Sequence, residues 1–449
     1  MVRLERAAVS LMGTGLQALR GTSDVLGEEV TRWLAVETAV RRLSRIYGYQ
    51  ELRTPILEDA ALFRRSVGET SDIVQKEMFR FEDRGGHELV LRPEGTAAIV
   101  RAYLEHHLHK TLGFAKLFYL GPMFRAERPQ AGRFRQFHQF GVEAIGSGSP
   151  WVDVEAIALC VEMLRACGVK DYSVWIGSMG SREDQQQSAE ALRKRLEPHR
   201  SQLCKACQAR FDKNVFRILD CKNPQCHALA WETTAEQEAR GHFQSPFLLS
   251  EESKDRFDEV CNGLRTAGIP FDDTQVFARG LDYYTHTVFE VRAGGLGAQD
   301  AVAAGGRYDH LVEELGGPSA GAVGFAAGIE RVLLAAQPSG GTPPAEPARQ
   351  GLYFAIASAS RLGEGFRFIR ELRRRGVCAM MDYEGRSLKA QLREADKHLA
   401  RYVAILGDAE IDQQAMTLKD LETAEQRTVP FSTFFDEMAA ACQPGTAIA

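Results

Sequence analysis

Hydrophobic residues in the first third of the chain alternate between helical and extended spacing. From Leu26 onward apolar residues recur at helical period, and the pattern ends at Gly48 and Tyr49. Pro55 prevents that helix from continuing, so the segment around it is expected to be extended. In residues 76–95, apolar and polar residues alternate on both sides of a Gly-Gly pair, which predicts a β-hairpin. A helical pattern follows this hairpin.

Two predicted strands with a long loop between them come next. Residues 117–124 are apolar, residues 136–143 alternate, and the loop between them is rich in Pro, Gly and Arg. A helical pattern begins at Trp151. Residues 172–270 are more polar and charged, with helical segments and a cysteine-containing piece, and we interpret them as an inserted domain.

The last part of the chain contains a second set of strands and a separate small domain. Residues 278–336 return to strand patterns and end in a glycine-rich strand that runs into a helix. Residues 337–350 have the Pro/Gly-rich composition of an interdomain linker. Beyond it, apolar segments at 352–358, 378–383 and 402–407 alternate with helical segments, which predicts an α/β domain with a largely parallel sheet.

Length, charge and cysteine content narrow the class of protein. The chain has 449 residues, more than a single core usually serves, and its net charge is -5. Contacts to nucleic acid would therefore depend on locally placed arginines rather than on an overall positive field. No apolar run approaches the roughly 20 residues that span a bilayer, and the N-terminal stretch lacks a convincing signal peptide. Nine cysteines, an odd number, favour a reducing cytoplasm over a disulfide framework.

Arginines crowd the loop between the two central strands. Arg125, Arg128, Arg133 and Arg135 lie within a short window, and the planar guanidinium group is well suited to hold phosphate. If the first strand continues to Glu127, that carboxylate and Arg125 point to the same face. The number of arginines in this short loop, taken alone, leaves two interpretations open: a phosphate-binding site or a solvated surface loop.

The second central strand and a glycine-rich segment carry further candidate chemistry. Gln139 and Glu143 are four residues apart on a strand, so they share a face and can contact both donor and acceptor sides of a polar ring. Residues 321–331 are rich in Gly and Ala, which lets a flat ligand lie against the strand, and Arg331 follows at the start of a helix. No P-loop or dinucleotide-binding fingerprint is present, so ATP, if bound, is bound in another way.

These segments resemble the three signature motifs of class II aminoacyl-tRNA synthetases. The Pro55 segment is similar to the first motif, which builds the dimer interface in that class. Residues 124–143 resemble the second motif, and residues 324–331 (GFAAGIER) resemble the third.

Three further peptides narrow the resemblance to histidyl-tRNA synthetases. Residues 278–284 (ARGLDYY) and 304–309 (AGGRYD) are similar to the two peptides specific to that family, and residues 91–96 (LRPEGT) also match it. The resemblance runs in order from Leu16 to Thr433.

The resemblance implies an α+β fold with a class II antiparallel-sheet catalytic domain, an inserted mainly helical domain, and a C-terminal α/β anticodon-binding domain. It implies ATP-dependent activation of L-histidine and its transfer to tRNA(His), with Mg2+, by a cytoplasmic homodimer that does not associate with membranes. The expected domains are residues 1–171 and 271–336 for the catalytic part, 172–270 for the insertion, 337–350 for the linker, and 351–449 for anticodon binding.

For histidine, the resemblance implies one group of residues at the ammonium and another at the imidazole. The first group is Glu94 and Thr96, assisted by Gln139, and the second is Glu143 with Tyr283 or Tyr284.

For ATP, the resemblance implies that arginines compensate the charge of the phosphates. Arg125 and Arg331 would contact the α- and γ-phosphates, and Glu127 would contact the adenine or a magnesium ion. Arg133 would lie near the phosphates and the tRNA acceptor end. Arg279 would lie at the α-phosphate opposite Arg125, supplying charge where related enzymes use metal, so these two are the expected catalytic residues. The α-carboxylate of histidine is already ionised, so no general base is required for activation.

Four cysteines leave one question of metal binding open. Cys204 and Cys207 have zinc-ligand spacing, but four residues separate Cys221 from Cys226, which is looser than the usual partner pair. Buried thiols often pack as small hydrophobes, and the resemblance implies no structural zinc, so no bound metal is expected here.

Two rival functions remain open. One is a non-catalytic relative that serves as a regulatory subunit of a histidine-biosynthetic enzyme, a group that lacks the C-terminal domain and parts of the active site. The other is an RNA-binding or signalling module with a synthetase-like domain. The retained Arg125, Glu127, Arg279 and Arg331, together with a C-terminal domain, favour the enzyme.

Overall fold

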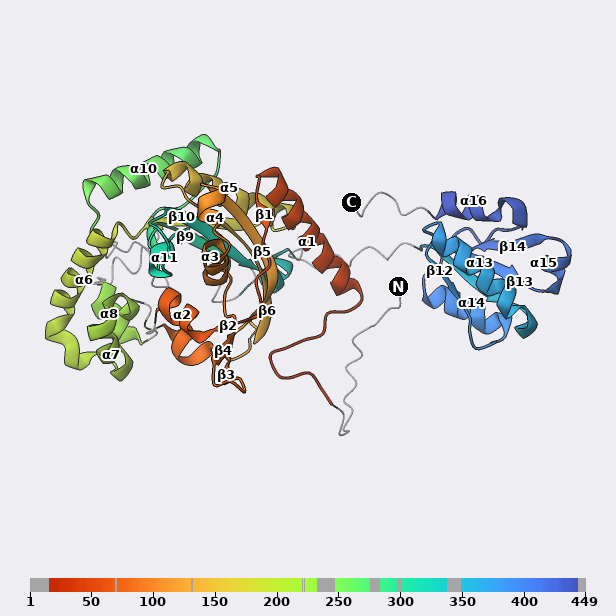
Figure 1. Cartoon of the computed structure of the whole chain (residues 1–449), viewed down its shortest axis with the longest axis horizontal. Coiled ribbons are helices and arrows are strands. Elements are labelled where there is room, and N and C mark those ends of the chain that lie inside the picture. The colour runs from red at the N-terminus through yellow and green to blue at the C-terminus, as the bar shows by residue number, and fades with distance from the viewer. Residues whose placement is uncertain are drawn as a thin grey trace. The chain divides into compact units, whose positions relative to one another are not determined.

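The computed structural model describes residues 16–68, 71–130, 132–219, 221, 223–231, 247–274, 283–294, 296, 300–336 and 349–442 (Figure 1). The chain forms two compact units, the larger holding residues 15–24 and 29–341 and the smaller holding mainly residues 342–449. Among the described residues, no helix is long and apolar enough to cross a membrane.

A seven-stranded sheet is the centre of the larger unit. Its strand order is β1-β5-β6-β10-β9-β8-β7. Every neighbouring pair is antiparallel except β1 and β5, which run parallel. The strands are β1 (Gln50–Glu51), β5 (Ala115–Phe124), β6 (Gln136–Ile145), β7 (Tyr172–Ser178), β8 (Thr285–Ala293), β9 (Ala301–Arg307) and β10 (Ala322–Gly328).

Strands β5 and β6 confirm the two predicted central strands. They pair from Ala115↔Ile145 to Phe124↔Gln136, so the arginine loop begins where the pairing ends. Strand β5 ends at Phe124, and the expectation that Arg125 and Glu127 share a strand face is therefore wrong. Both residues belong to an irregular segment after the strand, where the Arg125 amide donates to the Arg135 carbonyl and the Ala126 amide donates to the Glu77 carbonyl.

Helices cover the sheet, and their caps explain where they start. Helix α5 (Pro150–Ala166) packs on β6, β8, β9 and β10, with α10 (Glu251–Thr266) beside it (Figure 1). The Ser149 hydroxyl accepts from the amide of Trp151 and Pro150 occupies the first turn, both typical of a helix start. The other helical elements of the larger unit outside the insertion are α1 (Glu28–Ile46), α2 (Ala60–Val67), the π-helical turn η1 (Ile73–Glu77), α3 (Thr96–Glu105), α4 (Leu108–Thr111), α11 (Leu311–Glu314) and α12 (Ile329–Ala335).

The predicted hairpin forms part of a small second sheet. Strands β3 (Arg80–Glu82) and β4 (Glu88–Leu91) pair antiparallel, and β2 (Leu57–Asp59) pairs with the other side of β4. The helical pattern after it is interrupted at His107, whose φ of 54° ends α3 and starts the separate α4.

The insertion has its own core. It comprises α6 (Arg182–Leu196), the 3-10 turns η2 (Glu197–Gln202) and η3 (Val215–Ile218), α7 (Lys205–Lys213) and α8 (Pro224–Trp231). These elements bury Leu192, Leu196, Leu203, Phe211, Ile218 and Trp231 together. The two ends of the expected insertion, residues 172–270, belong to the part of the chain around the seven-stranded sheet. At one end β7 pairs with β8, and at the other α10 packs on α5. We therefore propose narrower bounds, near residues 182–231, for the part that stands apart from the sheet.

The smaller unit is a five-stranded sheet with helices. Strands β12 (Ala379–Met381), β11 (Leu352–Ile356) and β13 (Tyr402–Leu406) run parallel, as the alternating pattern predicts. Strands β14 (Ala415–Asp420) and β15 (Gln426–Pro430) continue the sheet antiparallel, so the expectation of a largely parallel sheet is wrong at this edge. A short connection suffices for an antiparallel neighbour, and no crossover helix marks these strands in the sequence. The helical elements are η4 (Ala359–Arg361), α13 (Leu362–Arg374), α14 (Leu388–Lys397), α15 (Asp408–Asp412) and α16 (Phe431–Ala441).

Candidate active site

A cavity of about 600 Å³ lies over the face of the seven-stranded sheet. Its walls come from β5, β6, β9 and β10, from the loop after β5, and from the start of α12. The insertion also contributes, through Arg210 and Arg217. Of the residues expected at the site, Glu94, Thr96, Arg125, Glu127, Arg133, Gln139, Tyr283, Tyr284 and Arg331 line this cavity, and Glu143 lies beneath it against Gly324. Arg279 lies outside the described residues.

Glycines in the sheet make room for the polar side chains of the cavity. Gly324 of β10 pairs with Glu143 of β6, and a Cβ on Gly324 would lie 2.0 Å from the Glu143 carboxylate. Two residues earlier on β6, a Cβ on Gly141 would lie 2.5 Å from the ring of Tyr119, the partner of Gly141 on β5. The glycine-rich strand thus provides space for a buried acid, in addition to the flat surface that the sequence predicts.

Glu143 is a buried carboxyl group without a cationic partner among the described residues. Its side chain is 1% exposed, and its oxygens accept from the Thr96 hydroxyl at 2.7 Å and from the Tyr308 hydroxyl. Burial raises the pKa of Glu143 to about 8, against the lowering effect of the two hydroxyl donors. The group is therefore poised to interact with a cation or with a ring that carries a proton.

Two further polar groups line the cavity. Glu94 is buried and accepts from the backbone amides of Thr96 at 2.7 Å and Ala97 at 3.0 Å, at the N-terminus of α3. Burial raises the pKa of Glu94 above its usual range, although these amides oppose the shift. The amide oxygen Oε1 of Gln139 is buried and accepts no hydrogen bond from any described residue. An unpaired buried acceptor costs free energy, so this oxygen favours a ligand that donates.

Three tyrosines form the aromatic wall of the cavity. The ring centroids of Tyr283 and Tyr284 are 4.8 Å apart, and those of Tyr283 and Tyr308 are 5.7 Å apart. The Tyr284 carbonyl accepts from Gln185 of α6 at 3.0 Å, which ties this wall to the insertion. Tyr308 was not among the expected site residues, although it belongs to the AGGRYD peptide that resembles the family. Its role depends on reaching Glu143, which lies 165 residues away in the chain.

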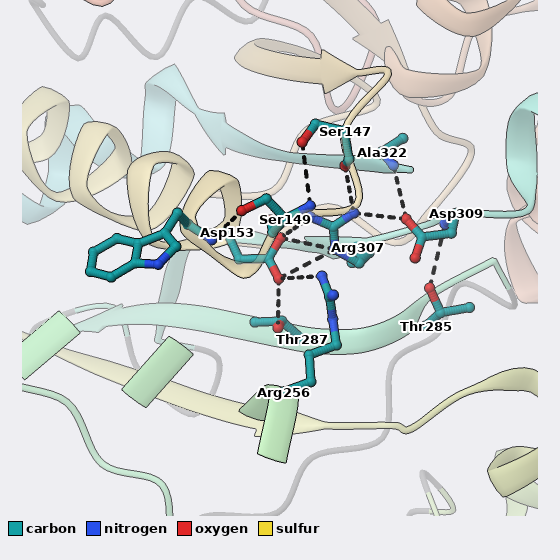
Figure 2. A network of polar contacts seen from close by, with 10 residues as sticks. Ser147, Ser149, Asp153, Arg256, Thr285, Thr287, Arg307, Asp309 and Ala322 are labelled. Atoms are coloured by element: carbon teal, nitrogen blue, oxygen red, sulfur yellow. Dashed lines mark hydrogen bonds and ion pairs between the residues drawn. The ribbon is translucent and has the colours of Figure 1, made fainter. Parts of the chain in front are cut away.

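The neighbour of Tyr308 is held by a buried polar network (Figure 2). Arg307 donates to Asp153 at 2.5 Å, to Asp309 at 2.9 Å, and to the carbonyls of Ser147 and Ser149 at 3.0 and 3.1 Å. Its Nε–H also donates to Asp153, so every N–H of the guanidinium has an acceptor. The network joins α5 to β9, and it fixes the end of β9 from which Tyr308 reaches Glu143.

Three of the expected arginines also line the cavity. Arg125 Nε donates to the Pro93 carbonyl at 2.9 Å, and its guanidinium carbon lies 5.4 Å from the centroid of the Phe137 ring. Arg133 pairs with Glu127 at 3.0 Å, and Arg331 Nε donates to the Ala301 carbonyl at 2.8 Å. Arg128, from the same loop, is exposed and does not line the cavity. The fold thus separates the arginines that the sequence leaves equivalent.

Comparison with known proteins assigns the family. The family model described as histidyl-tRNA synthetase matches residues 21–332, and the model described as anticodon binding domain matches residues 363–440. The chain belongs to the histidyl-tRNA synthetase family. The first match spans the whole cavity, and the second lies in the smaller unit.

Relatives of this synthetase cover nearly its full length. The histidine–tRNA ligase of Halothermothrix orenii is 43% identical over 94% of this chain and 99% of its own. That of Desulfitobacterium hafniense is 44% identical over 93% of this chain and 96% of its own. The crystal structure of apo Staphylococcus aureus histidyl-tRNA synthetase matches with a TM-score of 0.77 and 33% identity, over 95% of this chain and 100% of that one. The class II fold and the C-terminal anticodon-binding domain expected from the sequence are thereby confirmed.

Proposed function

We propose that the cavity on β6, β9 and β10 is the site where histidine and ATP react. The chain is a histidine–tRNA ligase that activates histidine with ATP and transfers it to tRNA, the activity named for its curated relatives. The observation that carries the location is that one cavity brings together buried, under-compensated acidic groups and several arginines. Histidine has a cationic ammonium group and a protonatable ring, and ATP is an anion, so the acidic groups fit one substrate and the arginines fit the other.

The acidic groups bind histidine in this proposal. The imidazole lies against Glu143, enclosed by the Tyr283 and Tyr284 rings, and a ring N–H donates to the carboxylate. The ammonium group donates to the vacant oxygen of Gln139 and to Glu94, with Thr96 at the same wall. A ligand that donates there supplies the hydrogen bond that Gln139 otherwise lacks.

The arginines bind ATP, with Arg125 at the α-phosphate and Arg331 at the γ-phosphate. A carboxylate oxygen of histidine attacks the α-phosphorus, the bond to the bridging oxygen breaks, and pyrophosphate leaves with the electron pair. Fixed guanidinium groups offset the repulsion between the two anions and stabilise the charge that develops on the phosphoryl oxygens. Arg279 acts at the same phosphate in this proposal, and Arg133 contacts the phosphates and the acceptor end of tRNA.

Transfer to tRNA then breaks the mixed anhydride. A terminal ribose hydroxyl attacks the carbonyl carbon of the histidyl group, and AMP leaves with the electron pair of the broken bond. A phosphate oxygen of the adenylate takes the hydroxyl proton, so no side chain has to act as a general base. The anticodon-binding domain in residues 363–440 places the tRNA for this step.

Magnesium enters with ATP in this proposal. The cavity carboxylates Glu77 and Glu127 are of the donor type that Mg2+ prefers, and burial raises the pKa of Glu77, so a cation would stabilise its ionised form. Glu127 is held by Arg133 and is available either to the metal or to the adenine amino group.

A homodimer in the cytoplasm is the proposed assembly. The segment that resembles the first class II motif, with the helix before it, exposes the large apolar side chains Leu34, Ile46, Ile56 and Leu57. Such side chains favour burial against a second copy. All nine cysteines are free thiols, as in a reducing compartment. Light scattering should give twice the 49.8 kDa of one chain, and a mass of one chain would contradict the dimer.

Histidine-dependent exchange of pyrophosphate into ATP tests the site. Arg125→Ala and Arg331→Ala should each lower the exchange rate by about 10²–10³-fold, because each removes a fixed donor from the transition state. Arg128→Ala is the matched control, since this exposed arginine of the same loop lies outside the cavity. Exchange that survives in both cavity variants, or in Arg279→Ala, would contradict the mechanism. A wild-type chain that binds histidine without exchange would instead favour the regulatory-subunit function.

A further inference from the structure

Four cysteine thiols of the insertion meet at one point. The sulfur atoms of Cys204, Cys207, Cys221 and Cys226 all lie within 4.8 Å of one another. The Cys204 and Cys221 sulfurs are 3.9 Å apart. They come from three separate pieces, the start of α7, the segment after η3, and the first turn of α8. All four are free thiols.

The geometry agrees with one tetrahedral metal ion. A tetrahedron with metal–sulfur bonds of about 2.3 Å has sulfur–sulfur edges of about 3.8 Å. Closing the cluster onto an ion therefore requires shifts of less than about 1 Å in the sulfur positions. Four residues separate Cys221 from Cys226, but Pro224 starts α8 between them, and the first helical turn brings Cys226 back toward Cys221. Loose spacing in sequence is thus compatible with a compact site.

Backbone amides already point at two of the sulfurs. The Cys204 amide donates to the Cys226 sulfur at 3.2 Å, and the Asn223 amide donates to the Cys221 sulfur at 3.4 Å. Hydrogen bonds of this kind orient metal-bound thiolates and stabilise their charge.

We propose that Cys204, Cys207, Cys221 and Cys226 bind one structural Zn2+ ion. Four thiolates in a tetrahedron select Zn2+ among common divalent cations and leave no open position for substrate. The expectation of no bound metal, which rested on spacing and resemblance, is replaced by this proposal. The ion would reinforce a domain whose own core is small.

The site also has a consequence for the active-site cavity. Arg210 lies three residues after Cys207 and Arg217 lies four residues before Cys221, and both arginines line the cavity. Arg210 contacts Asp72 at the cavity at 3.4 Å and the Arg217 carbonyl at 3.3 Å. The metal thus fixes both ends of the segment that carries these arginines.

Metal analysis of the full-length wild-type protein tests the proposal. Protein purified without chelator should contain one zinc per chain by inductively coupled plasma mass spectrometry. After exchange with Co2+, it should show the visible ligand-field bands and the near-ultraviolet charge-transfer band of a tetrahedral thiolate site. Iron in place of zinc, absence of any metal, or disulfides between these cysteines in thiol titration under denaturing conditions would each overturn it.

Variants localise the metal. Cys221→Ser and Cys226→Ser should each lose most of the zinc and the cobalt bands, because serine does not replace a thiolate ligand. Cys378→Ser, which removes an exposed thiol of the other unit, is the matched control and should keep one zinc per chain. Zinc retained in both cluster variants would overturn the assignment. If those variants do not fold, the metal content and cobalt spectrum of the wild type decide.

Discussion

Two buried acids of the larger unit, Asp153 of α5 and Glu143 of β6, differ in how fully the surrounding residues compensate their charge. Asp153 is fully buried and is surrounded by Arg307, Arg256 and the Thr287 hydroxyl (Figure 2). Glu143 is as deeply buried, but the described residues give it only the hydroxyls of Thr96 and Tyr308. Two adjacent residues of the chain therefore contact the two acids, Arg307 at Asp153 and Tyr308 at Glu143.

The difference in partners indicates that Asp153 is buried for stability and that Glu143 is buried to bind a ligand. Two guanidinium groups and a hydroxyl compensate the charge of Asp153, so this carboxylate does not need a ligand as a partner. At Glu143 the compensation is incomplete, and the raised pKa is the sign of that deficit. A cationic or protonated substrate can supply the positive charge or proton donor that the described residues do not give Glu143. For this reason we place the imidazole there. The following predictions test this contrast, beginning with the largest effect.

Breaking the structural pair should have the largest effect. Arg307→Met leaves Asp153 buried with only the more distant Arg256 as a cation, so the larger unit should lose about 3–5 kcal/mol of unfolding free energy. Urea unfolding followed by tryptophan fluorescence measures this. Arg307→Met combined with Asp153→Leu should recover part of the loss, because no unpaired charge remains. A loss below about 1 kcal/mol in the single variant would show that the pair is not a structural element.

Removing the charge at the functional acid should impair histidine use selectively. Glu143→Gln cannot present a carboxylate to the imidazole, and hydrogen bonds to charged groups contribute about 1.5–3 kcal/mol. The kcat/KM for histidine in the exchange assay should fall roughly 10- to 150-fold. The KM for ATP should stay unchanged and is the internal control. An equal loss for both substrates would mean that the residue acts on the whole site.

The same variant should change how stability depends on pH. The pKa of Glu143 is about 8 in the folded chain and near its ordinary 4.5 when unfolded, so the unfolded state binds fewer protons between these values. Wild-type stability is then lost as pH rises through this window, by at most about 1.4 kcal/mol per pH unit from this group. Glu143→Gln lacks this dependence, so its stability relative to wild type should rise from pH 5 to about 8 and then level off. A constant difference in thermal midpoint across that range would contradict the raised pKa.

Removing one hydroxyl donor should have the smallest effect. Tyr308→Phe deletes a hydrogen bond that favours ionised Glu143, at a cost of about 1 kcal/mol, or roughly fivefold in kcat/KM for histidine. The pKa of Glu143 should rise further, which moves the corresponding limb of the pH–rate profile to higher pH. Tyr103→Phe removes a buried tyrosine hydroxyl outside the cavity and is the control. An unchanged pH profile in Tyr308→Phe would mean that the hydroxyl is only structural.

Sequence patterns predicted the individual helices and strands better than the way the strands pair in the sheets. The hairpin at β3 and β4 and the pairing of β5 with β6 follow from local alternation and from the loops between the strands. The sequence did not predict the antiparallel edge strands of the C-terminal sheet, because the pairing of β14 and β15 depends on contacts with neighbouring strands and not on their own residue pattern. The end of β5 at Phe124 could not be read from the residue types around Arg125.

The sequence by itself predicted the family, the order of most elements and a set of site residues of which nine line the cavity, because motifs and periodicity are local properties of the chain. Only the tertiary structure decided which arginines of one loop face the cavity and which, like Arg128, face solvent. It also decided the burial of Glu143, which raises the pKa of this carboxyl group, and it brought Cys226 to Cys204. Protonation depends on burial and on donors such as Thr96 and Tyr308, and metal binding depends on distances between sulfur atoms. Both are set by contacts between segments far apart in the chain, which no local pattern records.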